Sequence, residues 1–239
     1  MAYAESAPME VAPMTEHEAN PIAGGASAEP RALATAYELL ALSFRHPGPE
    51  LAGAVASGEW ADAAAEVAVA LGLALPDGWD AGLESYAGRD PEALLHALRA
   101  EATRLFVGAP DPAVSPYEGV WRAADDGVQA LLFVNPHSMA VERFMRGCGL
   151  GRPEGTNEPL DHAAAELELL QWLCMLECGL AAAPEGAEPP HGSWAAARER
   201  FLGEHARTWM PRFAEAVAAE SREPLYCAAA QLLGAVIAG

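Results

Sequence analysis

The stretch NEPLDHAAAELELLQWLCMLE, residues 157–177, decides the fold class of this chain. Alanine and leucine dominate it, so it predicts a helix. At its start, Asn157 can act as the N-cap, Pro159 fits the first turn, and Asp161 lies close to the free amide groups and the positive end of the helix dipole. His162 has no such explanation, because a cation is disfavoured at this end of a helix.

The polar cluster at the start of this helix has three interpretations. It can be a plain helix cap, in which Glu166 lies four residues after His162 and pairs with its imidazole. It can be a metal site, in which Glu204 and His205 of a later helix join this pair, although no HExxH, ExxH or Cys/His motif supports such a site. It can also be a surface that binds another protein. The residues alone leave all three open.

Helical patterns continue along the chain. Apolar residues recur at helical spacing in residues 31–44, where they are Leu33, Tyr37, Leu40 and Phe44. Further helices are predicted within residues 46–58, 59–73, 90–108, 128–133, 135–150, 157–177, 193–220 and 224–239. Residues 109–121 are predicted to form a Pro-rich loop. No segment alternates as a strand does. We therefore predict an all-α protein with roughly nine to eleven helices in a single globular domain over residues 31–239, with a candidate hinge at 149–158.

The first 30 residues differ from the rest. Residues 1–30 mix Ala, Pro, Gly, Ser and Glu without periodicity, which is typical of a disordered acidic tail. They contain no basic residue and no continuous apolar run, so we expect neither a secretory signal nor a transit peptide. No later segment approaches the length of a membrane span. These observations predict a cytoplasmic protein without stable membrane insertion.

The charged residues narrow the classes of function. The chain has 34 acidic and 14 basic residues, giving a formal net charge of −20, and every basic residue is arginine. Without lysine, P-loop, Schiff-base and lysine-base chemistry are excluded. An acidic surface repels nucleic acid and attracts basic peptides. The cysteines form no CxxC pair and predict free thiols in a reducing compartment; they are Cys148, Cys174, Cys178 and Cys227.

Aromatic residues gather in two stretches. Phe106, Tyr117 and Trp121 lie around the Pro-rich loop, where such residues either cover the core or anchor a bound peptide. Trp209 and Phe213 belong to a stripe with spacings of three and four in FLGEHARTWMPRF, a pattern more typical of a core than of a site. No GxSxG or GxGxxG motif accompanies a strand, so the chain lacks these enzyme motifs as well.

Four stretches in the same order resemble the TorD/DmsD family of cytoplasmic chaperones that mature molybdenum oxidoreductases. EPLDH followed by Glu166 is similar to the family signature E-P-x-D-H-xxx-E. AYELLALSFRHPGPELA resembles its first helix pair, RLFVG with SPYEGVW resembles its aromatic loop, and FLGEHARTWMPRF resembles its F-L-x-x-H-x-x-x-W-x-P-x-F helix. The resemblance runs from about Arg31 to the C-terminus. Gly119 departs from it, since serine is expected in the aromatic loop.

The resemblance implies an all-α fold without catalytic activity. It implies binding of the twin-arginine signal peptide, or of the apo form, of a molybdopterin oxidoreductase catalytic subunit, which delays export until molybdopterin guanine dinucleotide is inserted. It implies no resident cofactor. Some members of the family contact that cofactor or a guanine nucleotide, but this chain has no P-loop that would support such contacts. The implied binding residues are Glu158, Pro159, Asp161, His162, Glu166, Leu105, Phe106, Tyr117 and Trp121. Their carboxylates are expected to pair with arginines, and their apolar side chains to receive the hydrophobic part of the peptide.

Two other functions compete with this one. The chain could be a metal-dependent all-α enzyme that uses His162, Glu166 and His205, or a permanent accessory subunit of the oxidoreductase complex. Metal content would test the first alternative, and fractionation would test the second. The residues identify neither the client enzyme nor the choice between monomer and homodimer.

Overall fold

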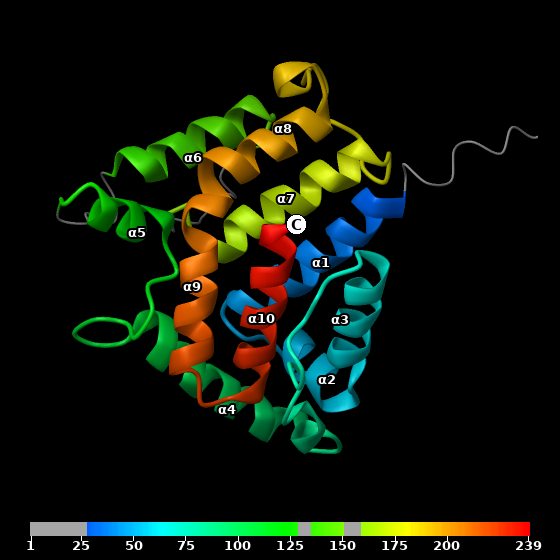
Figure 1. Cartoon of the computed structure of the whole chain (residues 1–239), viewed down its shortest axis with the longest axis vertical. Helices are drawn as coiled ribbons and strands as arrows, with labels where there is room; N and C mark the ends of the chain where they lie inside the picture. Colours follow the sequence, from blue (N-terminus) through cyan, green and yellow to red (C-terminus); the bar gives the residue numbers. More distant parts are fainter. Residues whose placement is uncertain (1–27, 129–134, 151–158) are drawn as a thin grey trace, which may run out of the picture.

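The computed structural model describes residues 28–128, 135–150 and 159–239, and these ranges are helical (Figure 1). They contain ten α-helices and no strand, so the predicted all-α fold is confirmed. The α-helices are α1 (Ala28–Phe44), α2 (Pro49–Ser57), α3 (Glu59–Ala70), α4 (Pro91–Ala102), α5 (Glu118–Asp125), α6 (Pro136–Gly147), α7 (Ala163–Glu177), α8 (Trp194–Phe201), α9 (Arg207–Glu220) and α10 (Pro224–Ala238). Shorter turns are η1 (Leu83–Tyr86), η2 (Thr103–Val107), η3 (Pro190–Gly192) and η4 (Leu202–Ala206).

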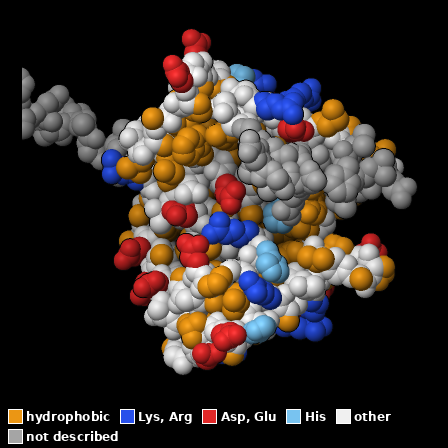
Figure 2. Space-filling model, turned by 180° about the vertical axis from the view of Figure 1, so that it is seen from behind, with side chains coloured by type: hydrophobic (Ala, Val, Ile, Leu, Met, Phe, Trp, Pro, Cys, Tyr) orange, Lys and Arg blue, Asp and Glu red, His pale blue; other side chains and the backbone are white. Residues whose placement is uncertain are grey.

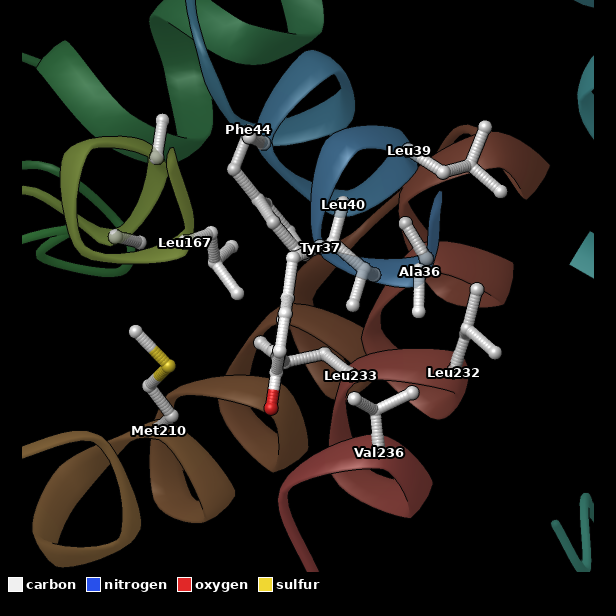
Figure 3. Close-up of a cluster of buried hydrophobic side chains, with 14 of the residues drawn as sticks. Ala36, Tyr37, Leu39, Leu40, Phe44, Leu167, Met210, Leu232, Leu233 and Val236 are labelled. Atoms are coloured by element: carbon white, nitrogen blue, oxygen red, sulfur yellow. The ribbon is translucent and has the colours of Figure 1, made fainter. Parts of the chain in front are cut away.

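Two helix pairs form the centre of the molecule. Helix α1 packs along α7, and α10 packs along α9 and also touches α1 (Figure 1). Figure 3 shows side chains from these helices meeting in the core, among them Tyr37, Leu167, Met210 and Val236. The predicted apolar stripe of α1 is confirmed, because three of its four members are buried and Leu33 packs against the core from a partly buried position.

The helix starts follow local sequence rules. Pro91 and Pro136 occupy the first turns of α4 and α6, where a missing N–H leaves no hydrogen bond unmade. The carboxylate of Asp90 accepts a hydrogen bond from the amide of Ala93 at 2.9 Å, and Asn135 caps α6 in the same way. The predicted helices over 90–108 and 135–150 are therefore confirmed in position.

Several predicted boundaries need correction. Helix α5 begins at Glu118, inside the predicted loop 109–121, because the prolines that suggested a loop end at Pro116. The predicted helix 193–220 is divided by the π-helical turn η4. Helix α1 already begins at Ala28, within the predicted tail, whose first 27 residues lie outside the described residues. Most of the predicted helix 128–133 and of the candidate hinge 149–158 also lies outside them.

The four cysteines are free thiols, as predicted. Burial raises the pKa of Cys148 to about 11 and that of Cys174 to about 12, so both are protonated and unreactive near neutral pH. Within the three described ranges, no helix is both long and apolar enough to cross a bilayer.

Candidate functional site

His162 is the N-cap residue of α7. Its backbone is extended, and its Nδ1 atom accepts a hydrogen bond from the amide of Ala164 at 3.1 Å. This role requires a neutral imidazole with an unprotonated Nδ1, which accepts as an asparagine side chain does. The prediction that Asn157 caps this helix and that Pro159 lies in its first turn is therefore wrong. Pro159 precedes the helix, and Asn157 lies outside the described residues.

Asp161 precedes α7 in sequence but accepts hydrogen bonds from the start of α5. Its Oδ2 atom accepts hydrogen bonds from the amide of Gly119 at 2.8 Å and from the hydroxyl of Ser138 at 2.6 Å. Its carbonyl oxygen accepts from the amide of Glu118 at 2.9 Å. The side chain is 1% exposed. Asp161 therefore satisfies the free amides at the start of α5 and not those of its own helix.

The missing side chain of Gly119 is a requirement of this arrangement. A Cβ atom at this position would lie 2.8 Å from Ser138 Oγ and 2.9 Å from Asp161 Oδ2. Asn135 closes the remaining side, where its amide nitrogen donates to the Gly119 carbonyl at 2.7 Å. A serine here would collide with the residues that bind the glycine backbone. The departure from the family pattern is thus explained by close packing.

Residues 115–118 and 161–163 lie side by side. Tyr117 and His162 form an antiparallel bridge, and the amide of Ala163 donates to the Pro116 carbonyl at 2.8 Å. The rings of Tyr117 and His162 meet edge to face with centroids 5.2 Å apart. Two stretches more than 40 residues apart in sequence thus form one edge.

Trp121 continues this edge on α5. Its indole N–H donates to the carbonyl of Ser115 at 2.9 Å, which closes the turn before the helix. The guanidinium of Arg212 lies over the ring, 5.6 Å from its centroid, and also forms a two-point ion pair with Asp125. The ring is partly exposed and held from two sides.

A buried polar network lies beneath this edge. The carboxylate of Glu118 accepts from His205 Nδ1 at 2.8 Å and from Arg122 at 3.2 Å. The carboxyl of Glu166 accepts from the indole N–H of Trp209 at 3.2 Å. Glu118 and Glu166 are fully buried. Glu118 thus joins α5 to η4, and Glu166 joins α7 to α9, while the Arg122 side chain remains 25% exposed.

The surroundings of Glu166 favour its protonated form. Burial, and next the negative charge of Glu118, raise the pKa of the Glu166 carboxyl well above its ordinary value. Its Oε1 atom has no hydrogen-bond donor among the described residues, and a proton on this carboxyl would let it donate toward Glu118. Burial also raises the pKa of Asp161, although the hydrogen bonds from Ser138 and Gly119 oppose this.

The raised pKa of Glu166 predicts a pH-dependent stability. A carboxyl whose pKa rises on folding stabilises the folded state most below its unfolded pKa of about 4.3. This contribution is lost as the pH rises through the folded pKa. We expect the free energy of unfolding to fall as the pH rises above about 4.3 and through the raised pKa of Glu166, and to fall less in Glu166→Gln. Urea denaturation at a series of pH values measures both slopes. Glu92→Gln, an exposed control, should keep the wild-type slope, and an unchanged slope in Glu166→Gln would contradict the assignment.

Two of the predicted binding residues lie in the core. Leu105 is completely buried. Phe106 is 9% exposed and packs against Phe44, Phe213 and Tyr226, with ring centroids 5.7 to 6.3 Å apart. Both side chains therefore belong to the core and leave almost no surface to a peptide. Glu158 lies outside the described residues.

The structure offers no ligand set for the metal alternative in the part of the chain that it describes. No group of three or more His, Cys, Asp and Glu side chains there could hold an ion. His205 directs Nδ1 to Glu118, and Glu166 directs Oε2 to Trp209. The predicted pairing of Glu166 with the His162 imidazole is replaced by these contacts.

Sequence reasoning missed the roles of Glu118 and Arg122. Their spacing of four residues was a readable signal for an ion pair on one helix face, but the segment was assigned to a loop. The assignment of Trp209 and Phe213 to the core is confirmed, because both are completely buried.

A model of the nitrate reductase delta subunit family matches residues 72–215, well over half of the chain. The chain belongs to this TorD-like family. The resemblance read from the four stretches is thereby confirmed, and the matched range contains the whole edge and the network beneath it.

Two known proteins are similar to the chain. The chain is 32% identical to the selenate reductase assembly chaperone protein of Thauera selenatis over 125 residues, which are 52% of this chain and 59% of the relative. The chain thus spans less than two thirds of that relative. A solved structure of a candidate redox enzyme maturation protein from Archaeoglobus fulgidus is also similar, with 19% identity, a TM-score of 0.49 and coverage of 91% of this chain and 97% of that one. This likeness is too weak to support a function.

Proposed function

We propose that the chain is a cytoplasmic assembly chaperone that binds the apo form of a molybdopterin oxidoreductase catalytic subunit and its twin-arginine leader. It holds the subunit back from export until the cofactor is inserted. The observation that carries this proposal is the edge formed by residues 115–118 and 161–163, because it joins the two family motifs on one partly exposed surface. The family assignment and the name of the Thauera relative support it.

The edge has the composition of a protein-binding surface. Tyr117 and His162 are partly exposed members of the edge, and Trp121, which continues it, and Pro159, two residues before Asp161, are partly exposed as well. Aromatic side chains with an apolar body and a polar end bind protein partners well and lose little conformational entropy on binding. Because the buried network fixes the backbone under them, these side chains are already arranged before the client arrives.

The same network favours a binding protein over an enzyme. General acid and base groups must reach the reacting atoms of a substrate. Glu118 and Glu166 are fully buried, and His205 is 6% exposed and bonded to Glu118. These titratable groups act within the protein, so we assign them no catalytic role and propose no cofactor of the chain's own.

Affinity purification of the tagged chain from cells that produce its client tests the proposal. We expect it to capture a molybdopterin oxidoreductase catalytic subunit in its cofactor-free form, and to capture less when the leader of that subunit is deleted. Recovery of the chain at equal stoichiometry in the mature, exported enzyme would contradict the proposal and identify a permanent accessory subunit. Recovery of the holoenzyme alone would also contradict it.

Replacing Trp121 by alanine should weaken client binding. Hot-spot aromatic residues typically contribute more than about 2 kcal/mol, so we expect the affinity for the apo subunit to fall at least about tenfold. Calorimetric titration of the purified partners measures this change. Trp194→Ala removes another partly exposed tryptophan, on α8, and should leave the affinity within about threefold of wild type. Equal effects of the two variants would contradict a binding role for Trp121.

A further inference from the structure

A hollow lies between the end of α3 and the segment that follows it, away from the edge. Its volume is about 590 Å³. Its lining includes Ala68 and Val69 of α3, and Leu73, Leu75 and Trp79 of the following segment. A second hollow of about 240 Å³ lies on the other side of Asp80, over Val55 and Leu83. Asp80 lines both hollows, so they are adjacent, and the two together are called the groove below.

The segment that builds the groove is firmly attached. Leu73, Leu75 and Trp79 pack against the core, and the amide of Leu73 donates to the carbonyl of Ala68 at 2.9 Å. At the far end, Gly82 has φ +88°, and a Cβ atom there would lie 2.8 Å from Pro224 of α10. The groove is therefore held open by packing and does not depend on a ligand for its shape.

The floor of the groove is apolar and open to solvent. Val69 is 83% exposed, the highest value among the large hydrophobic side chains of the described residues. Trp79 is partly exposed beside it. Covering such side chains with an apolar chain stem removes them from water at roughly 25 cal/mol per Å². The floor thus favours a partner with methylene groups or other apolar atoms.

The rim of the groove carries negative charge without compensation. Asp77 and Asp80 line the larger hollow, and Asp62, Asp80 and Glu84 line the smaller one. None of these four carboxylates forms an ion pair with another described residue, and none of the lining residues is basic. Figure 2 shows the face opposite to that of Figure 1, on which some acidic groups lie beside basic ones and others do not.

Among the described residues of the edge, no carboxylate is exposed to an incoming arginine. Asp161 and Glu166, which the family resemblance offers as partners for the two arginines of a leader, are buried and bonded within the protein. An arginine that reached them would have to displace these internal bonds and lose its own hydration. Arginine side chains are therefore better received by exposed carboxylates elsewhere on the molecule.

We propose that this groove, between α3 and residues 71–87, binds the two arginines of the client's leader peptide, one in each hollow on either side of Asp80. The proposal rests on the proposed function for the identity of the client. Each arginine would lay its apolar stem over the floor and direct its guanidinium to the carboxylates of the rim. Trp79 offers a ring face to the same cation.

The negative charge of the groove argues against other classes of binding partner. Residues 1–27 of the chain contain four glutamates and no arginine or lysine, so the groove repels them. A second copy of a chain with a net charge of −20 is repelled for the same reason. Nucleic acid and anionic lipid carry the wrong sign. A basic peptide with apolar residues beside its arginines is complementary to both the acidic rim and the apolar floor of the groove.

Fluorescence anisotropy with a labelled synthetic peptide tests the proposal. The peptide carries two adjacent arginines followed by a run of leucine and alanine, and a matched peptide has both arginines replaced by glutamine. In Asp77→Asn with Asp80→Asn, we expect the affinity for the arginine peptide to fall about tenfold, as for loss of two partly exposed ion pairs. The control Glu92→Gln with Glu215→Gln removes the same charge from exposed sites on α4 and α9, and should change the affinity less than about threefold.

The outcomes separate the groove from the wider function. A tenfold loss in the groove variant, absent from the control and absent with the glutamine peptide, supports the proposal. Equal losses in both variants would show a general charge effect and overturn it. If the groove variant kept wild-type affinity for the arginine peptide and Trp121→Ala lost affinity, the leader would bind at the edge. That result would overturn the groove proposal and leave the proposed chaperone function intact. No binding of the arginine peptide by the wild-type chain would overturn both the groove and leader recognition, whereas capture of the apo subunit tests the chaperone function independently.

Discussion

Replacing Glu118 by alanine is expected to lower the free energy of unfolding by about 3–5 kcal/mol, the range for breaking a buried charge pair. Glu118 is fully buried and accepts hydrogen bonds from His205 and Arg122. Alanine removes the buried acceptor of both groups and leaves the His205 imidazole unpaired there, while Arg122 still donates to Thr208 and to the Glu204 carbonyl. Urea denaturation followed by circular dichroism measures the loss.

A matched ion pair on α6 provides the control. Glu142 and Arg146 are also four residues apart on one helix, but Glu142 is partly exposed and Arg146 is exposed. Glu142→Ala should therefore change the free energy of unfolding by less than about 1 kcal/mol. Glu118→Gln keeps an acceptor and should cost less than Glu118→Ala. If Glu118→Ala and Glu142→Ala were equally mild, the buried network would not stabilise the fold as inferred.

Replacing Trp209 by alanine should have an effect of similar size, about 3–5 kcal/mol. The side chain is completely buried, packs against Phe213 with ring centroids 5.4 Å apart, and donates a hydrogen bond to Glu166. Alanine leaves a large cavity and removes the donor from a buried carboxyl. The same urea denaturation measures this loss.

Trp209→Phe separates the two contributions. Phenylalanine fills most of the cavity but cannot donate to Glu166, so we expect an intermediate loss. Trp194→Ala, which removes a partly exposed tryptophan from the start of α8, should cost clearly less than Trp209→Ala. A loss below about 1 kcal/mol in Trp209→Ala would contradict the placement of this residue in the core.

The residues of the family motifs fall into two groups, one that stabilises the fold and one that is expected to bind the client. Glu118, Glu166 and Trp209 belong to conspicuous stretches, yet they are buried and serve the fold. Tyr117 and Trp121 belong to the same aromatic stretch as Glu118 and are partly exposed, so client binding is expected to depend on them. Variants of the first group should lose stability and binding together, whereas variants of the second should lose binding alone.

Much of the fold was predictable from local patterns. The apolar spacing of α1, the prolines at the starts of α4 and α6, and the stripe containing Trp209 and Phe213 all concern residues within one or two helical turns. Such patterns arise from backbone geometry and from the need to bury one helix face. The start of α5 was missed because prolines just before it resemble those of a longer loop.

The amino-acid sequence by itself determined the all-α class, the core stripes, the free thiols and the family. Only the tertiary structure decided which polar residues are buried and which are offered to a partner. His205 reaches Glu118 across 87 residues, Trp209 reaches Glu166 across 43, and the Gly119 amide reaches Asp161 across 42. Helical periodicity relates residues three or four positions apart, whereas these contacts depend on how whole helices pack. For this reason Asp161 and Glu166 were predicted to bind a guest and are instead bonded within the protein.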